Sequence, residues 1–305
     1  MTDTPLRKIA ILGAGTMGLG VAEYFSVAGL DVTISDMTPE LSRQAIDRAK
    51  TVQSADDIAS CVCDVDLVFE AVPEKIDIKR DVLQAVEATI SSDTIIVSNT
   101  SSLPIDDLAV FLNHPHRFLG MHWFNPPEWT PGVEVIPSDV TDPKIVEQIK
   151  AFLLAIGKRP ALVGSGPGFV ANRIQFALFR EALACVEAGL ATPQEVDEVV
   201  RSCFGFRLPF FGPFQIADMA GLDVYASIFP VLEKSLGEEW KLPDVLKKVV
   251  DEGKYGTKTG EGFYKYSDEE REKLLIERDR RYAGLNDLLK QHPPLTPNSD
   301  TEDES

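Results

Sequence analysis

Short apolar runs alternate with longer helical patterns over the first half of the chain. Residues 8–13 (KIAILG) and 31–36 (DVTISD) have the composition of strands. Helical spacing follows the first run to about Ala28 and begins again at Pro39. A strand, a helix and a second strand in this order predict a β-α-β unit, in which the two strands lie parallel.

Five further strand-like runs follow, and most are separated by segments long enough for a helix. They lie at residues 66–72, 94–99, 117–123, 132–137 and 160–164. Strands that alternate with helices in this way form open sheets with helices on both faces. The first part of the chain is therefore expected to be a doubly wound, largely parallel α/β sheet.

The pattern changes at the Gly/Pro cluster of residues 164–168, after which the apolar positions follow helical spacing alone. Further helix signals lie at residues 193–203, 224–236, 243–252 and 267–289, the last of them amphipathic. We expect a sheet domain at residues 1–165, an all-helical domain at residues 166–292, and a disordered acidic tail at residues 293–305.

Length and charge narrow the class of protein. A chain of 305 residues is long for one core, since domains commonly have roughly 100 to 200 residues. A formal net charge of −18 disfavours nucleic acids and acidic membranes as partners. Because the chain also lacks an apolar run long enough to span a membrane, a cytoplasmic location is expected. The four cysteines of the chain lack the spacing of metal ligands, so no metal site is predicted.

A glycine-rich turn follows the first strand and opens the first helix. It reads Gly13-Ala14-Gly15-Thr16-Met17-Gly18. Such a turn brings the backbone close to a pyrophosphate, which the helix N-terminus then binds. Asp36 ends the second strand, where a carboxylate accepts hydrogen bonds from adenosine ribose hydroxyls and repels a 2′-phosphate. The pattern predicts NAD as cofactor rather than NADP, although glycines also mark plain tight turns and Asp36 also suits a turn.

His122 lies at the end of a strand-like run, directly before the proline-containing loop FNPP, and Glu134 falls in the next run. Open α/β sheets bind ligands at the ends of their strands. A carboxylate bonded to one imidazole nitrogen fixes the tautomer and leaves the other nitrogen free to act as a base. His122 and Glu134 are therefore candidates for a catalytic pair, whereas the other three histidines are expected to be structural or exposed.

These motifs, in this order, resemble the 3-hydroxyacyl-CoA dehydrogenase family from Lys8 to about Tyr266. The resemblance implies a Rossmann domain followed by a helical domain, and a dehydrogenase in which His122 and Glu134 form the catalytic dyad. It also implies roles for residues in three further motifs, SNTSS (98–102), PGFVANR (167–173) and VPEKIDIK (72–79). Ser101 and Asn172 would bind the substrate oxygen. The residues implied at the cofactor are Asn99, Glu74 and Lys79. Taken alone, Ser101 also suits a strand end and Asn172 a helix cap.

Two features depart from the acyl-CoA members of that family. The segment from Asp36 to Asp66 has room for one helix and a connection, whereas acyl-CoA enzymes carry a longer helical arm there. Arg207, in GFRLPFFGP, resembles branches that act on free acids: L-gulonate 3-dehydrogenase (lambda-crystallin), carnitine dehydrogenase and a pyridine-carboxylate dehydrogenase of vitamin B6 breakdown. An arginine can hold a carboxylate through two parallel hydrogen bonds. It also commonly forms surface or interdomain ion pairs, so that interpretation stays open.

The leading hypothesis is an NAD-dependent oxidoreductase for the secondary or benzylic-type hydroxyl of a small free hydroxy acid. The hydroxyl is expected to lie β to the carboxylate, as in a 3-hydroxy acid, and Arg207 to bind the carboxylate. The alternatives are a short-chain 3-hydroxybutyryl-CoA dehydrogenase and a non-catalytic, crystallin-like NADH-binding protein. The resemblance also implies a homodimer formed through the helical domain.

Overall fold

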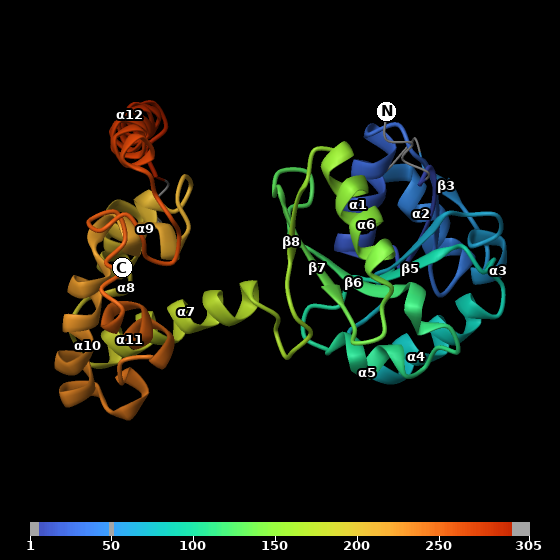
Figure 1. Cartoon of the computed structure of the whole chain (residues 1–305). Helices are drawn as coiled ribbons and strands as arrows, with labels where there is room; N and C mark the ends of the chain where they lie inside the picture. Colours follow the sequence, from blue (N-terminus) through green and yellow to red (C-terminus); the bar gives the residue numbers. More distant parts are fainter. Residues whose placement is uncertain (1–5, 49–51, 295–305) are drawn as a thin grey trace, which may run out of the picture. The chain divides into compact units, whose positions relative to one another are not determined.

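The first part of the chain forms one eight-stranded sheet (Figure 1). The computed structural model describes residues 6–48 and 52–294, so most of the tail expected at residues 293–305 lies outside the described residues. The strands are β1 (Lys8–Leu12), β2 (Asp31–Ser35), β3 (Gln53–Ser54), β4 (Leu67–Glu70), β5 (Ile95–Ser98), β6 (Phe118–Trp123), β7 (Gly132–Pro137) and β8 (Arg159–Leu162). Their order is β3-β2-β1-β4-β5-β6-β7-β8, and only β6 and β7 are antiparallel. The doubly wound sheet predicted from the sequence is confirmed.

Helices cover both faces of the sheet, which is why all side chains of β4, β5 and β6 are buried. The helices of this part are α1 (Thr16–Val27), α2 (Pro39–Arg48), α3 (Ile58–Cys61), α4 (Ile76–Glu87), α5 (Ile105–Ala109) and α6 (Pro143–Ala155). Phe25 of α1 and Phe152 of α6 pack into the core on one face. Leu83 of α4 and Leu108 of α5 pack into a second core on the other face.

The β6–β7 hairpin differs from the rest of the sheet because its two strands are joined by a short loop instead of a crossover helix. The loop contains a cis peptide bond between Asn125 and Pro126. The antiparallel register places His122 directly opposite Glu134. In such a pair the two side chains lie on the same face of the sheet, close enough to interact.

The later part of the chain is helical, as the sequence predicts. Its helices are α7 (Ala171–Glu187), α8 (Pro193–Val199), α9 (Pro213–Ala220), α10 (Leu222–Leu236), α11 (Asp244–Asp251) and α12 (Asp268–Gln291). The chain forms two compact units that divide after Leu178, within α7, whereas the sequence places a boundary at residue 165. Unit 2 has its own small core around Leu222 and Leu246.

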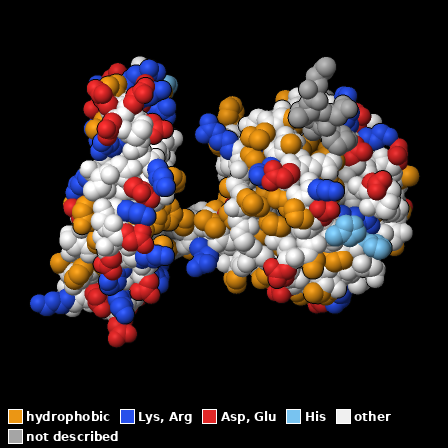
Figure 2. Space-filling view, in the orientation of Figure 1, with side chains coloured by type: hydrophobic (Ala, Val, Ile, Leu, Met, Phe, Trp, Pro, Cys, Tyr) orange, Lys and Arg blue, Asp and Glu red, His pale blue; other side chains and the backbone are white. Residues whose placement is uncertain are grey.

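Helix α12 differs from the amphipathic helix expected at residues 267–289. It buries none of its side chains, and its apolar residues do not gather on one face. Acidic and basic side chains are interspersed on the face of this helix that Figure 2 shows. Its capping box, in which Ser267 and Glu270 bond each other's backbone N–H groups, explains why the helix begins where it does. No described helix combines the length and the apolar character needed to cross a membrane.

Candidate active site

The glycines after β1 have three different environments. Gly13 has φ +103°, and a Cβ there would lie 2.5 Å from the Ala71 carbonyl oxygen. A Cβ on Gly18 would collide with the Gly13 carbonyl oxygen, so α1 packs tightly against the turn. Gly15, by contrast, has open space around its Cβ position and caps the N-terminus of α1. The turn fits a pyrophosphate, because Gly13 and Gly18 allow the tight shape of the turn and Gly15 leaves room for the ligand.

A narrow apolar slot lies beside this turn, between the ends of β1, β2 and β4 and helix α4. Its volume is about 130 Å³, and its lining includes Leu12, Ile58, Val72 and Val82. Asp36 also lines the slot, and its carboxylate accepts a hydrogen bond from the Ala14 N–H at 2.5 Å.

The slot fits the flat adenine ring, with Asp36 placed for the ribose hydroxyls. Of the described residues that line it, none is a lysine or an arginine that could receive a 2′-phosphate. The site therefore suits NAD. Thr16 is exposed at the start of α1, and Met17 packs partly against the core beneath the turn.

His122 and Glu134 meet across the β6–β7 hairpin. His122 Nδ1 lies 2.9 Å from Glu134 Oε2, and both side chains are about 95% buried. The imidazole ring packs against Phe124 and Phe169. His122 Nε2 makes no hydrogen bond to any residue that the structure describes, so one ring nitrogen is held and the other is available.

The second oxygen of Glu134 accepts hydrogen bonds from the backbone N–H groups of Val170 and Ala171, at 3.1 and 2.8 Å. These groups lie at the N-terminus of α7, where free N–H groups stabilise an anion. Burial by itself would raise the pKa of Glu134, but the hydrogen bonds from His122 and from this backbone bring it below its ordinary value. Glu134 is thus a charged and fixed partner for the imidazole.

The same helix start connects the dyad to Ser101. Asn172, on the first turn of α7, donates a hydrogen bond from Nδ2 to the Ser101 carbonyl oxygen at 2.9 Å. Ser101 follows β5, whose neighbour β6 carries His122. The structure therefore connects all four residues predicted for catalysis within unit 1: His122 to Glu134, Glu134 to the start of α7, and α7 to Ser101.

The three remaining cofactor candidates lie at the ends of β4 and β5. Asn99 Oδ1 accepts a hydrogen bond from the Trp123 N–H at 2.8 Å. The Glu74 side chain is 34% exposed, and its carboxylate accepts hydrogen bonds from the turn after β5. Lys79 is only 1% exposed, and its Nζ forms ion pairs with Glu70 and Glu74. The structure thus places Lys79 behind Glu74 rather than at the surface of the site.

Arg207 lies in unit 2, in the turn Gly205–Arg207. It lines a hollow of about 310 Å³ together with Arg278, Asp279, Tyr282 and apolar residues of α9. Asp279 forms its ion pair with Arg278. Its Nε is buried without a hydrogen-bond partner, and no carboxylate of the described residues forms an ion pair with it. Among the described residues, Arg207 thus lacks the acidic partner that an ion pair would require.

Two buried charged residues near the site were missed from the sequence. Glu70 ends β4, fully buried, and Lys158 precedes β8, 3% exposed. The signal for Glu70 is a carboxylate at the end of an apolar run, FEAVPEK. The signal for Lys158 is weaker, because a lysine between a helix and a strand is usually exposed.

Both parts of the chain match the models of one known protein family. The model for the 3-hydroxyacyl-CoA dehydrogenase NAD-binding domain matches residues 8–53 and 42–166, and the model for the family's C-terminal domain matches residues 168–266. The chain is 37% identical to 5-formyl-3-hydroxy-2-methylpyridine 4-carboxylate 5-dehydrogenase of Mesorhizobium japonicum, over 93% of this chain and 99% of that protein.

Two other relatives carry acyl-CoA names. The chain is 33% identical to a probable 3-hydroxybutyryl-CoA dehydrogenase of Bacillus subtilis, over 86% of this chain and 98% of that protein. The crystal structure of a 3-hydroxyacyl-CoA dehydrogenase from Archaeoglobus fulgidus superposes with a TM-score of 0.79 at 32% identity, covering 93% of this chain and 98% of that one. Since both family models match and together span most of the chain, the chain belongs to the 3-hydroxyacyl-CoA dehydrogenase family and is an NAD-dependent dehydrogenase acting on hydroxyl groups.

Proposed function

We propose that the chain oxidises the hydroxyl group of a small free hydroxy acid, with His122 as the general base. The bound nicotinamide supplies the hydride acceptor. His122 Nε2 removes the hydroxyl proton, and in the reverse direction the imidazolium returns it. Glu134 holds Nδ1 and stabilises the charged ring, because it is itself ionised and fixed by the start of α7.

Ser101 and Asn172 bind the reacting oxygen in this proposal. Asn172 holds the backbone of Ser101 through its amide, so the two residues form one rigid edge of the site. A hydroxyl and an amide held in this way fix the direction of the carbinol hydrogen. They also stabilise charge on the oxygen as the proton leaves.

The unpaired guanidinium of Arg207 is the observation that carries the choice of a free acid. A half-buried arginine that forms no ion pair with any described residue is suited to bind a carboxylate of a ligand, through two parallel hydrogen bonds. Tyr282 and Arg278 line the same hollow. The relative from Mesorhizobium japonicum is named for a substrate that carries a carboxylate.

The connection between β2 and β4 supports the same choice. It holds α2, the short strand β3 and the one-turn helix α3, so the described residues there form no long helical arm. The acyl-CoA alternative is favoured by the similarity to the Bacillus subtilis protein, and it requires other surfaces to hold CoA.

The test is a substrate panel followed by NADH absorbance: L-gulonate, 3-hydroxybutyrate, carnitine, hydroxylated aromatic acids and 3-hydroxybutyryl-CoA. Arg207→Ala should lower kcat/KM for the acid that is turned over by roughly 10- to 100-fold, the effect of losing hydrogen bonds to a charged group. Arg201→Ala is the matched control, since Arg201 lies nearby but already pairs with Glu198. Efficient turnover of the CoA ester that is indifferent to Arg207 would show the free-acid proposal to be wrong.

We also propose that the chain forms a homodimer through its helical unit. Helix α7 buries none of its side chains. Ile174, Phe176, Phe179 and Leu183 on it are 47–63% exposed. An apolar surface of this kind commonly marks a protein interface. A second copy of the chain is the proposed occupant.

A further inference from the structure

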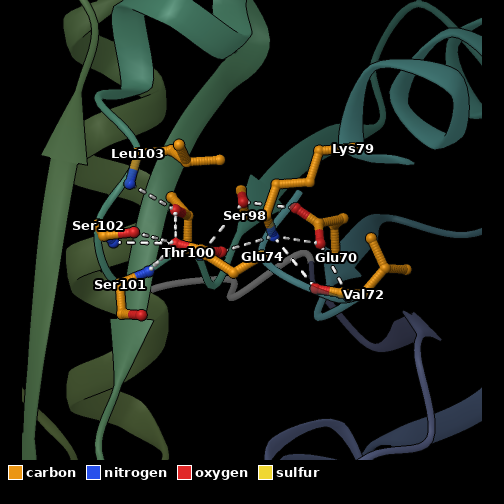
Figure 3. A network of polar contacts seen from close by, with 9 residues as sticks. All are labelled: Glu70, Val72, Glu74, Lys79, Ser98, Thr100, Ser101, Ser102 and Leu103. Atoms are coloured by element: carbon orange, nitrogen blue, oxygen red, sulfur yellow. Dashed lines mark hydrogen bonds and ion pairs between the residues drawn. The ribbon is translucent and has the colours of Figure 1, made fainter. Parts of the chain in front are cut away.

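A buried ion pair lies under the turn that carries Ser101. Glu70, at the end of β4, is 0% exposed, and its carboxylate receives three hydrogen bonds. They come from Lys79 Nζ at 2.8 Å, from the Val72 N–H at 2.8 Å and from the Ser98 hydroxyl at 2.5 Å. Because all of these donors are within the protein, Glu70 and Lys79 are fixed by their surroundings rather than by a ligand (Figure 3).

Lys79 also forms an ion pair with Glu74, and so connects Glu74 to the buried Glu70. Its ammonium group has three protons and three acceptors around it: Glu70 Oε1, the Val72 carbonyl oxygen at 3.3 Å, and Glu74 Oε2 at 3.3 Å. The donor capacity of Lys79 is therefore used within the protein. Contact with a cofactor would require one of these bonds to break, at the cost of leaving a buried charge less well paired.

Glu74 in turn holds the turn after β5. Its Oε1 accepts hydrogen bonds from the Thr100 hydroxyl at 2.6 Å, from the Ser101 and Ser102 N–H groups at 3.0 and 2.9 Å, and from the Ser102 hydroxyl at 2.9 Å. The Ser101 side chain points away from this carboxylate (Figure 3). Its hydroxyl has no hydrogen-bond partner among the described residues.

We propose that Glu74 is a positioning residue for Ser101, and that the buried Glu70–Lys79 pair holds Glu74 in place. Both backbone polar groups of Ser101 are hydrogen-bonded: its N–H donates to Glu74, and its carbonyl oxygen accepts from Asn172. Only the side chain is left free. This assignment rests on the proposed role of Ser101 and changes the role of Lys79 from binding the cofactor to holding Glu74.

The charge of Glu74 is stable at working pH. Burial by itself would raise its pKa, but the Thr100 hydroxyl, Lys79 and Ser102 bring it down to about 2. An ionised carboxylate accepts stronger hydrogen bonds than a neutral amide. Replacing it with glutamine should therefore loosen the turn while leaving its shape almost unchanged.

The decisive experiment is a double-mutant cycle of Glu74→Gln and Ser101→Ala. The substrate is the panel acid turned over fastest, or 3-hydroxybutyryl-CoA if no acid reacts. Glu74→Gln alone should lower kcat roughly 10- to 100-fold, because a small displacement of a positioning group has effects of that size. In the Ser101→Ala background, the same change should cost less than about threefold, since the group that Glu74 positions is already absent.

Binding of NADH, followed by its fluorescence, separates positioning from direct contact with the cofactor. The Kd for NADH should change less than about threefold in Glu74→Gln and in Lys79→Arg, which keeps the charge. Lys79→Met should lower kcat as Glu74→Gln does. If that variant does not fold, Lys79→Met combined with Glu70→Gln removes the whole buried pair without leaving a lone charge.

Glu87→Gln is the matched control. Glu87 also binds a loop with its carboxylate, through the Asn113 and His114 N–H groups, but that loop does not carry Ser101. It should leave kcat unchanged. Two results would overturn the positioning role of Glu74 and leave the proposed function intact. One is an equal loss of kcat on Glu74→Gln in the wild-type and Ser101→Ala backgrounds. The other is a Kd for NADH that rises in Glu74→Gln by as large a factor as kcat falls. If Ser101→Ala left kcat unchanged, the proposed role of Ser101 would be refuted, and the positioning role of Glu74 would be refuted with it.

Discussion

At the scale of single residues, His122 depends on Glu134 for its orientation. The carboxylate holds Nδ1 at 2.9 Å and is itself fixed by two backbone N–H groups of α7. Because the pKa of Glu134 is lowered, its charge persists below the roughly pH 4.3 at which an ordinary glutamate gains its proton. Glu134 therefore keeps its negative charge through the neutral and mildly acidic pH range.

Glu134→Gln should lower kcat by roughly 100- to 10,000-fold, the range expected when a general base loses its orientation and its charged partner. The measurement is kcat against pH for the variant and the wild type, with NADH binding as a check on folding. Glu147→Gln is a suitable control, because the Glu147 side chain is 69% exposed and forms an ion pair with Lys150, away from the dyad. A variant that keeps more than a third of the wild-type kcat would contradict the role of Glu134.

At the scale of elements, Lys158 holds the loop of the β6–β7 hairpin. Its ammonium donates to the carbonyl oxygens of Pro127 and Thr130. It also lies 3.8 Å from the centroid of the Tyr24 ring and 4.8 Å from that of Trp123. Tyr24 belongs to α1, so this one group connects the cofactor helix with the hairpin that carries the dyad.

Lys158→Met should lower the free energy of unfolding by about 1–3 kcal/mol, because it leaves one buried and one partly buried carbonyl oxygen without this donor. Urea denaturation followed by circular dichroism measures the change. Lys150→Met, which removes an exposed pair on α6, should stay within about 0.5 kcal/mol of the wild type. Equal stability of the two variants would mean that the buried ammonium contributes nothing to the hairpin.

At the scale of the whole molecule, the dimer proposal rests on the exposed apolar side chains of α7. Light scattering should give a mass of twice the chain's 33.5 kDa for the wild type. Phe176→Glu should shift the mass towards one chain, because a buried carboxylate at an apolar interface is strongly unfavourable. Val110→Glu, at an exposed apolar residue of unit 1, should not. A wild-type mass of one chain would refute the dimer.

The sequence by itself determined the order of strands and helices, the glycine turn with Asp36, and the likeness of its motifs to one family. These follow from local patterns, since side-chain periodicity and turn residues act over a few positions. It also singled out His122 and Glu134, although only the antiparallel register of β6 and β7 places them opposite each other.

The tertiary structure alone decided which charged residues are buried and what they hold. Glu70, Lys79 and Lys158 have ordinary positions in the sequence, but the fold surrounds each of them with partners from distant segments. It also placed Lys79 behind Glu74 and left Arg207 without an ion-pair partner among the described residues. The physical reason is that burial and pairing depend on contacts between strands, loops and helices far apart in the chain, which no local pattern records.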